Sequence, residues 1–473
     1  MIRMSNRIAN FFNAKSFCVI GASTNLLKPG GVVAENFAKD FPGKLFLVNP
    51  RGGTHIFAGK EYTLYKSVLD IEEEIDAAII IVPAKFAPQA LEECGKKNIK
   101  NVIVTTGGFA EIGEEGVAIQ NRMNDIMKTY NINIIGPNCL GLYSPVLGYD
   151  TMFLPVNKLK RPKPGSVSIF TQSGAFGAAF IDQLARLGSG NWIARFISYG
   201  NASDINEADC IEYLGDDEDT KMILVYLEDF KNGRKFMETL REVSLKKPVL
   251  GIKANRTEAG AKAGASHTAA LSSDDAIVDD LLKEAGFQRV ITWDELEDCV
   301  ISFATQPLPK GNRVAIVTDG GGAGVMASDM VSDCKLQLAK FSPEIQKKLD
   351  ETFPVYYSTT NPIDITGSAN EKDYEKALEA VYEDPEVDAV VNICIPSIPN
   401  LDINEYIEIT RKIASRKEKT FVTALIGGEE ADYAYDVLLK EDFAVFKSPG
   451  SAIRAVGRLV EYVNYLKKRG KNL

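Results

Sequence analysis

The sequence is poor in the side chains that most often build metal sites and disulfide frameworks. Only two histidines occur among 473 residues, and the seven cysteines are scattered, odd in number and never arranged as Cys-x-x-Cys. Zinc sites and cysteine-rich scaffolds need paired or closely spaced ligands. We therefore expect no metal site, no disulfide framework and a reducing, cytoplasmic environment.

Long apolar runs and an excess of positive charge are also missing. No run approaches the roughly 20 apolar residues of a membrane-spanning helix, and the N-terminal segment lacks the apolar core of a signal peptide. The net charge is −10, with acidic and basic residues interspersed. Binding to a phosphate backbone requires clustered Lys and Arg. These absences argue against a membrane protein and against a nucleic-acid-binding protein.

What the sequence does contain is an alternation of short β-branched runs with longer amphipathic stretches. The short runs occupy residues 17–20, 45–48, 77–82, 102–104 and 133–135. This alternation is typical of βαβ units, which form a mostly parallel sheet with helices on both faces and bind ligands beyond the carboxyl ends of the strands. Two Pro-containing polar stretches, 158–165 and 306–311, predict linkers. Length and linkers together predict three α/β domains.

The first βα turn and the end of the second strand indicate a nucleotide-like ligand. The turn Gly21-Ala22-Ser23 is followed by Gly30-Gly31, a weak match to a dinucleotide-binding fingerprint. The second strand leads into Asn49 and Arg51, where an NAD-binding fold usually places Asp or Glu. A base at this point suits the ribose phosphate of CoA or NADP better than the free ribose of NAD. CoA fits best, and NADP remains the rival.

Two further turns are expected at the same edge of the first sheet. Val82-Pro83 and Asn138-Cys139 both follow predicted strands, so they could line one cleft with the first turn. The alternative is that these are ordinary turns punctuated by Pro and Gly, with Cys139 a small buried apolar residue.

Two segments that follow the predicted linkers begin in nearly the same way. Residues 167–177 and 314–324 each read as a buried strand ending in Thr, followed by a Gly-rich turn and a helix start. Backbone N–H groups and the positive end of the helix dipole converge at such a point and can hold a phosphate. The alternative is that glycine only permits a tight turn. The candidate phosphate-binding residues are Gln172, Ser173, Gly174 and Ala175 in the first copy and Gly321, Gly322 and Ala323 in the second.

His267 stands in a run of small residues, Gly264-Ala265-Ser266-His267-Thr268. The preceding residues are also small or polar and show neither helical nor strand periodicity, so we expect a loop. The charge of an imidazole changes close to neutral pH, which suits a nucleophile or a proton carrier. His267 is therefore a candidate catalytic residue. The alternative is a surface histidine in a flexible loop.

The order of these motifs resembles that of the α-subunit of ADP-forming acetyl-CoA (acyl-CoA) synthetases, in the succinyl-CoA synthetase superfamily. The resemblance covers essentially the whole chain. It implies a Rossmann-like CoA-binding domain over residues 1–145, followed by two flavodoxin-like domains over residues 146–308 and 309–473. The motifs that carry it are, in order, Gly21-Ala22-Ser23, residues 49–53, Gly136-Pro137-Asn138-Cys139, residues 171–174, Tyr199-Gly200-Asn201, Ser266-His267-Thr268 and residues 320–324.

The resemblance also implies a reaction: acyl-CoA, phosphate and ADP give the acid, CoA and ATP through an acyl phosphate and a phosphohistidine. His267 would be transiently phosphorylated, and Glu228, at the end of a predicted strand, would orient and charge its ring. A carboxylate suits that place, because neutral imidazole attacks well only if its other ring N–H is held. The alternative for Glu228 is a solvated charge beside Asp229.

The nucleotide is expected on another chain. No P-loop motif occurs, so the resemblance implies that ADP or ATP and Mg²⁺ bind to a separate β-subunit of ATP-grasp fold, in an α2β2 heterotetramer. The rival function is a non-catalytic module that senses CoA or NADP and regulates a partner. His267 and the two helix starts favour the enzyme, because a sensor does not need them. The sequence does not name the acyl group.

Overall fold

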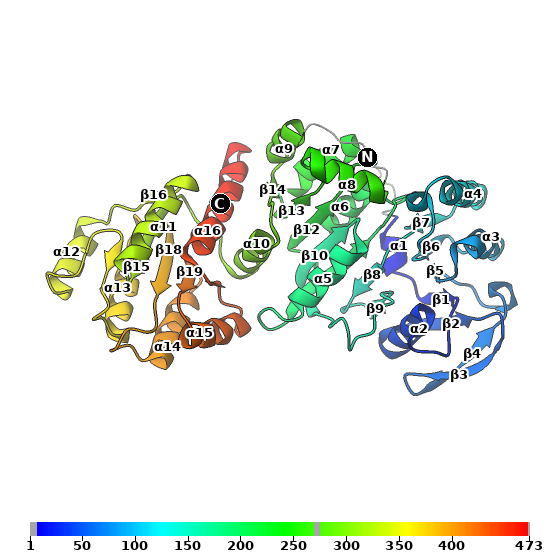
Figure 1. Cartoon of the computed structure of the whole chain (residues 1–473), viewed down its shortest axis with the longest axis horizontal. Coiled ribbons are helices and arrows are strands. Elements are labelled where there is room, and N and C mark those ends of the chain that lie inside the picture. The colour runs from blue at the N-terminus through cyan, green and yellow to red at the C-terminus, as the bar shows by residue number, and fades with distance from the viewer. Residues whose placement is uncertain (1–6, 269–274, 472–473) are drawn as a thin grey trace. The chain divides into compact units, whose positions relative to one another are not determined.

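The computed structural model describes residues 7–268 and 275–471, which form two compact units (Figure 1). Unit 1 runs to Arg289, except for residues 187–190, which belong with residues 290–473 in unit 2. Each unit holds one of the two tryptophans, Trp192 in unit 1 and Trp293 in unit 2. No helix in the described part of the chain is long and apolar enough to span a membrane.

The first sheet of unit 1 has seven strands in the order β3-β4-β2-β1-β5-β6-β7, and every neighbouring pair is parallel except the β3–β4 hairpin. The five strand-like runs of the sequence all lie in this sheet. The strands are β1 (Ser16–Ile20), β2 (Lys44–Val48), β3 (Gly53–Phe57), β4 (Lys60–Tyr65), β5 (Ala77–Ile80), β6 (Asn101–Val104) and β7 (Asn133–Ile135).

Helices cover both faces of this sheet because successive side chains of a strand point to opposite sides. Phe17 and Val19 of β1 pack in one core with α1 (Ala9–Phe12) and α2 (Pro29–Asp40). Cys18 and Ile20 pack in a second core with α3 (Ala87–Lys96) and α4 (Glu114–Tyr130). Burial on both faces explains why the parallel strands read as continuous apolar runs.

The second sheet of unit 1 has the order β14-β13-β12-β10-β11-β8-β9 and is parallel except at β8 and β9. Its strands are β8 (Gly141–Ser144), β9 (Tyr149–Asp150), β10 (Lys163–Thr171), β11 (Asn191–Ser198), β12 (Met222–Leu227), β13 (Val249–Lys253) and β14 (Phe287–Arg289). Its helices are α5 (Gly174–Leu184), α6 (Glu207–Asp216), α7 (Gly233–Val243), α8 (Glu258–Thr268) and α9 (Asp275–Glu284).

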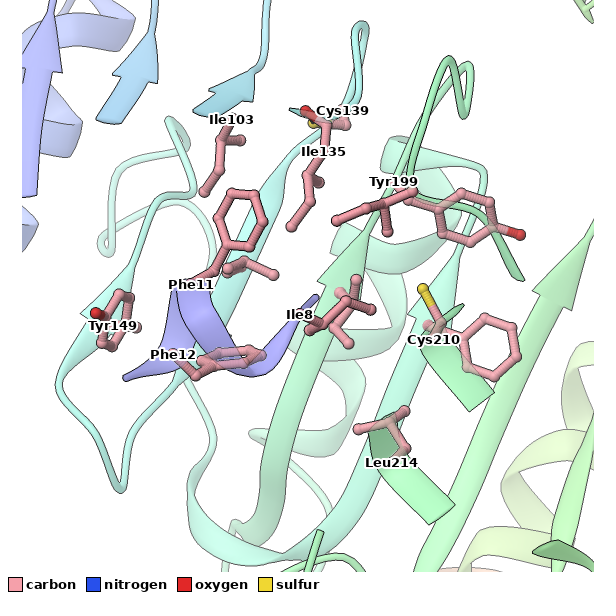
Figure 2. Close-up of a cluster of buried hydrophobic side chains, with 14 of the residues drawn as sticks. Ile8, Phe11, Phe12, Ile103, Ile135, Cys139, Tyr149, Tyr199, Cys210 and Leu214 are labelled. Carbon is pink, nitrogen blue, oxygen red and sulfur yellow. The ribbon is translucent and has the colours of Figure 1, made fainter. Parts of the chain in front are cut away.

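One hydrophobic core joins the two sheets of unit 1. Figure 2 shows the short helix α1 between them, with Phe11 beside Ile103 and Ile135 of the first sheet. The same core continues into Cys210 and Leu214 of α6, which belongs to the second sheet. Because these side chains are buried together, the two sheets hold a fixed relation inside the unit.

Unit 2 contains a six-stranded parallel sheet in the order β16-β15-β18-β19-β20, with β17 also paired to β15. Its strands are β15 (Arg313–Thr318), β16 (Gln337–Leu338), β17 (Ile363–Asp364), β18 (Ala389–Cys394), β19 (Thr420–Leu425) and β20 (Val445–Phe446). Its helices are α10 (Trp293–Thr305), α11 (Gly321–Asp333), α12 (Pro343–Thr352), α13 (Glu371–Glu383), α14 (Ile403–Ala414), α15 (Glu429–Lys440) and α16 (Pro449–Lys468).

The boundary between the units falls after Arg289, in neither of the expected linkers. The stretch 158–165 lies inside unit 1. Its last three residues form the start of β10, where shifts in the strand register accommodate Pro164 and Gly165. The stretch 306–311 lies inside unit 2. The three-domain boundaries 1–145, 146–308 and 309–473 stay a prediction.

Candidate functional site

A cavity of about 890 Å³ in unit 1 collects residues that follow strands of both sheets. Its volume is in the range of small-molecule and cofactor sites, roughly 300–1,000 Å³. From the first sheet come Thr105 after β6 and Asn138 and Cys139 after β7; from the second come Gln172, Ser173, Gly174 and Ala175 after β10, Asn201 after β11 and Glu228 after β12. The cavity therefore lies beyond the carboxyl ends of parallel strands, where α/β folds bind ligands.

The start of α5 borders this cavity, as the sequence predicts for a phosphate site. Ser173 caps the helix, its Oγ accepting the N–H of Phe176 at 3.2 Å. Gly174 and Ala175 form the first helical turn and line the cavity. The free N–H groups and the positive end of the helix dipole at such a start favour an anion.

Gln172 has a further task that the sequence did not reveal. Its side-chain Oε1 accepts the backbone N–H of Glu228 and, at 3.0 Å, that of Asp229. The amide of Gln172 thus ties the turn after β10 to the turn after β12. Gln172 was predicted to bind phosphate, but its side-chain carbonyl oxygen is already hydrogen-bonded to the backbone at Glu228 and Asp229.

Glu228 is half-buried and lines the cavity directly after β12. Its carbonyl oxygen accepts two hydrogen bonds, from Lys253 Nζ at 3.0 Å and from Asn255 Nδ2 at 3.2 Å. Burial, with the Glu228 carboxylate nearby, raises the pKa of Tyr226 to about 12. Glu228 thus lies at the end of β12 and at the edge of the cavity, where a carboxylate was expected. The catalytic role of Glu228 stays a prediction.

The expectation of a loop around His267 is wrong for its backbone, because α8 continues to Thr268. Small residues carry no periodic pattern, yet the alanines of this segment have the highest helix propensity of any residue. The backbone of α8 lies close to the 3-10 turn η3 (Ala110–Ile112), which borders the cavity. The side chain of His267 lies outside the described part of the chain.

Glu111, in η3, is a cavity residue that the sequence analysis missed. Its Oε1 accepts the N–H groups of Gly108 at 2.6 Å and Phe109 at 3.1 Å, and its Oε2 accepts Asn201 Nδ2 at 2.6 Å. Burial alone would raise the pKa of Glu111, but these hydrogen bonds bring it below its ordinary value. The only sequence signal was the Gly107-Gly108 pair after a strand, which marks a turn without naming the acid.

The predicted nucleotide-binding turn forms a separate stretch of the same sheet edge. The N–H groups of Gly21 and Ala22 both donate to Val48 O at 3.0 Å. Asn49 Nδ2 donates to Ala22 O at 2.7 Å, so this amide holds the turn together. Gly21 has φ +99°, and a side chain there would meet Ile81 O at 2.3 Å, so glycine is required. None of these residues lines the 890 Å³ cavity.

The remaining predicted CoA contacts also follow the edge. Ser23 and Val82 are partly buried, Pro83 and Arg51 are exposed, and the Arg51 guanidinium makes no hydrogen bond or ion pair with the residues that the structure describes. Val82 O accepts Thr106 Oγ1 at 2.7 Å, and Thr106 O accepts the N–H of Asn138 at 2.9 Å. The edge is therefore continuous from the first turn to the cavity, and an unpaired guanidinium there fits a phosphate-bearing ligand such as CoA.

Three family models match successive parts of the chain. A CoA binding domain matches residues 15–145, a succinyl-CoA ligase like flavodoxin domain residues 164–303, and a ligase-CoA domain residues 314–460. The α subunit of acetate–CoA ligase (ADP-forming) I from Pyrococcus furiosus is 38% identical over 463 residues, which are 97% of this chain and 98% of that protein. The chain belongs to the ADP-forming acyl-CoA synthetase α-subunits, in the succinyl-CoA ligase superfamily.

Other members of this family of synthetases agree with the assignment. The acetate–CoA ligase (ADP-forming) of Methanocaldococcus jannaschii is 37% identical over 95% of this chain, which spans 62% of that longer protein. Acetyl-coenzyme A synthetase 1 of Candidatus Korarchaeum cryptofilum, solved with phosphate and ADP, has a TM-score of 0.90 at 28% identity, covering 99% of this chain and 100% of that one. The predicted fold class is confirmed, and an α-subunit implies a partner subunit.

The second predicted phosphate site of the synthetase α-subunit lies in unit 2. Gly321 and Gly322 are exposed at the start of α11, and Ala323 is buried behind them. Two carboxylates of the chain stand nearby: a side chain at Gly321 would meet Asp364 Oδ2 at 2.7 Å, and Asp319 lies just before the helix. The structure places the helix start as predicted, and phosphate binding there stays a prediction.

Proposed function

We propose that this α-subunit catalyses the acyl and phosphoryl transfer steps of an ADP-forming acyl-CoA synthetase. Phosphate attacks the thioester carbonyl of acyl-CoA, which releases CoA and leaves an acyl phosphate. A ring nitrogen of His267 then attacks the phosphorus, and the carboxylic acid leaves. The phosphoryl group finally passes from His267 to ADP, which makes ATP. The overall reaction consumes acyl-CoA, phosphate and ADP and yields the acid, CoA and ATP.

One observation carries the proposal: a single cavity is bordered by the α5 start, by Glu228 and by the turn η3 beside α8, the helix of His267. The α5 start offers preorganised backbone donors for a phosphoryl group. Glu228 offers the carboxylate that orients the imidazole and stabilises its positive form. Asn138 and Cys139 bring the CoA-binding domain to the same cavity, so a thioester and a phosphate can meet there.

CoA is the proposed ligand of the first domain, held along the edge from Arg51 to Asn138. ADP or ATP and Mg²⁺ would bind to a β-subunit of ATP-grasp fold, and two copies of each subunit would form the heterotetramer. The start of α11, at Gly321 and Gly322, would hold the phosphoryl group at a second stage. The relatives named above are acetate–CoA ligases, which makes acetyl-CoA the first acyl donor to test.

A second candidate function, regulation of a partner by sensing CoA or NADP, is favoured by the exposed Arg51 alone. Titration calorimetry separates the ligands. We expect CoA to bind and NADP to give no heat; NADP binding with CoA inert would contradict the CoA assignment. A pure sensor would also bind its ligand without any phosphorylation of the chain.

The decisive experiment follows phosphate onto the chain. Incubation with acetyl-CoA and labelled phosphate should give an acid-labile, base-stable label on the wild type, as expected of a phosphohistidine. His267→Ala should carry no such label, because it lacks the imidazole that accepts the phosphoryl group. His55→Ala is the matched control, since His55 is the other histidine of the chain and lies on β3, away from the cavity. Equal labelling of the wild type and His267→Ala would overturn the proposal.

A further inference from the structure

The internal repeat of the sequence is a repeat of register as well. In unit 1, Thr171 of β10 pairs with Tyr226 of β12, and Leu227 pairs with Lys253 of β13. In unit 2, Thr318 of β15 pairs with Ile393 of β18, and Cys394 pairs with Leu425 of β19. The next backbone contacts also correspond, Ala254 N to Leu227 O at 2.7 Å and Ile426 N to Cys394 O at 2.9 Å. Equivalent positions in the two copies can therefore be compared one by one.

One polar contact is common to both copies. The residue after the threonine, Gln172 in one copy and Asp319 in the other, accepts the N–H of the residue after the neighbouring strand. That N–H belongs to Glu228 in unit 1 and to Ile395 in unit 2. Because the contact occurs in both copies, it is a feature of the fold and does not by itself indicate catalysis.

Lys253 has no such counterpart. Its place in the second copy is taken by Leu425, as Ile395 takes the place of Glu228. Lys253 is only 6% exposed, and its ammonium donates to Glu228 O at 3.0 Å and to Ala254 O at 2.7 Å. Burial, and then the charge of Arg289, lowers the pKa of Lys253. A buried cation costs free energy, and the second copy shows that the strand pairing does not need it.

Asn255 extends this contact toward α8. Its Nδ2 donates to the same Glu228 oxygen at 3.2 Å, and a methyl group on Gly264 would come within 2.3 Å of its Oδ1. Asn255 has φ +57°, a left-handed conformation that is uncommon for residues other than glycine, whereas its equivalent in the second copy, Gly427, has φ +148°. The Glu228 peptide is therefore connected through Asn255 to the helix of His267.

We propose that Lys253 is a positioning residue for phosphoryl transfer to His267: its ammonium fixes the Glu228 peptide, and with it the carboxylate, against the helix α8. This inference rests on the proposed function. Lys253 does not line the cavity; it acts through Glu228, and its positive charge also offsets the carboxylates of Glu228 and Asp229. Removal of the ammonium should therefore slow the phosphorylation of His267 without weakening CoA binding.

The test compares Lys253→Met with Lys247→Met. Lys247 is a matched control, because its Nζ also donates to two carbonyl oxygens, Leu214 O at 2.9 Å and Asp217 O at 2.6 Å, just before the same strand β13 at the opposite end. Rapid-quench labelling with acetyl-CoA and labelled phosphate gives the rate of phosphohistidine formation. We expect a loss of about 10-fold or more for Lys253→Met, which is less than the roughly 10²–10⁴-fold contribution of an acid–base group itself because Lys253 acts only through Glu228. We expect wild-type labelling for Lys247→Met.

The Michaelis constant and the unfolding midpoint distinguish positioning from general damage. For Lys253→Met we expect an unchanged KM for acetyl-CoA, a lower rate constant and an unfolding midpoint no lower than that of Lys247→Met. Lys253→Gln keeps one N–H donor and should recover part of the rate; if Lys253→Met does not fold, the rate of Lys253→Gln decides alone.

Labelling of the Lys253 variants at the wild-type rate, or an equal loss in Lys247→Met, would overturn the inference. Failure of the proposed function looks different, because the wild type itself would then carry no label.

Discussion

Asp319 shows how a buried carboxylate can stabilise a turn and still weaken the fold. Its two oxygens share the N–H of Ile395 at 3.0 and 3.1 Å, which holds the turns after β15 and β18 together. The side chain is 3% exposed, and burial, with Asp364 nearby, raises its pKa to about 6. Burial favours the protonated, neutral form of Asp319. Near pH 7 the carboxyl is ionised, and its buried charge lowers the free energy of unfolding.

This cost predicts a pH-dependent stability difference for Asp319→Asn. Between the ordinary pKa of 3.8 and the folded value of about 6, the folded chain binds a proton that the unfolded chain has lost. Through this residue, stability therefore falls as the pH rises from about 4 to about 6 and stays low above that. Asn keeps an oxygen for the Ile395 N–H and carries no charge, so we expect it to raise the free energy of unfolding at pH 7 by up to about 3 kcal/mol.

Denaturant unfolding of both proteins at pH 4, 5.5 and 7 checks this expectation. The advantage of Asp319→Asn should shrink as the pH falls and vanish near pH 4. A constant difference at all three pH values would show that the carboxyl group does not titrate as described.

At the scale of elements, the strands followed from the sequence and the helix α8 did not. β1 and β5 are buried over their whole length and β2 over Phe46–Val48, so their apolar runs can be read directly from the sequence. In α8 no apolar stripe marks the helix, because alanine is its only apolar side chain and the other residues are Gly, Ser, Thr, Lys, Glu and His. Absence of periodicity indicated a loop, whereas alanine propensity and a Glu in the first turn favour the helix that is present.

Gly264 on α8 tests whether this helix must lie close to Asn255. In Gly264→Ala the new methyl group would come within 2.3 Å of Asn255 Oδ1, so the helix or the amide has to move. We expect phosphohistidine formation to slow by about 10-fold or more, which is less than the roughly 10²–10⁴-fold contribution of an acid–base group itself because the variant only displaces its support. Rapid-quench labelling with acetyl-CoA and labelled phosphate measures it.

The control for this helix is Gly260→Ala, one turn earlier. A methyl group there lies 3.3 Å from Thr257 Oγ1, which accepts the N–H of Gly260 at 3.1 Å and has to shift by only a few tenths of an ångström. The methyl group makes no close approach to Asn255 Oδ1, so alanine at this position should leave the labelling rate unchanged. If both variants label alike, close contact between α8 and Asn255 is not required for the reaction.

At the scale of the whole molecule, the sequence motifs indicated individual residues of the site but not which residues they contact in the folded chain. Gly174, Asn138 and Glu228 could each be placed at a strand end. That one cavity collects them depends on a core between two sheets, to which Phe11 and Phe12 of α1 contribute. Glu111 and Lys253 were missed because their roles arise from contacts with residues 90 and 25 positions away in the sequence.

The whole enzyme is expected to need a second chain. We predict that the purified α-subunit, given acetyl-CoA, phosphate and ADP, makes no ATP although His267 becomes labelled, because the sequence holds no P-loop motif. Addition of a β-subunit of ATP-grasp fold should start ATP formation, and a luciferase assay follows it. The α-subunit with acetyl-CoA omitted is the control. Sustained ATP synthesis by the α-subunit alone would contradict the two-subunit assignment.

The placement of one tryptophan in each unit gives the protein two separate optical reporters. Trp192 lies in the interior of unit 1 and is 4% exposed, whereas Trp293 is the first residue of α10 in unit 2 and is only partly buried. In a Trp293→Phe protein the indole emission would come from unit 1 alone, and in Trp192→Phe from unit 2 alone. Ligand titrations followed by fluorescence could then assign each binding event to its unit, with no attached dye and no separation of the chain.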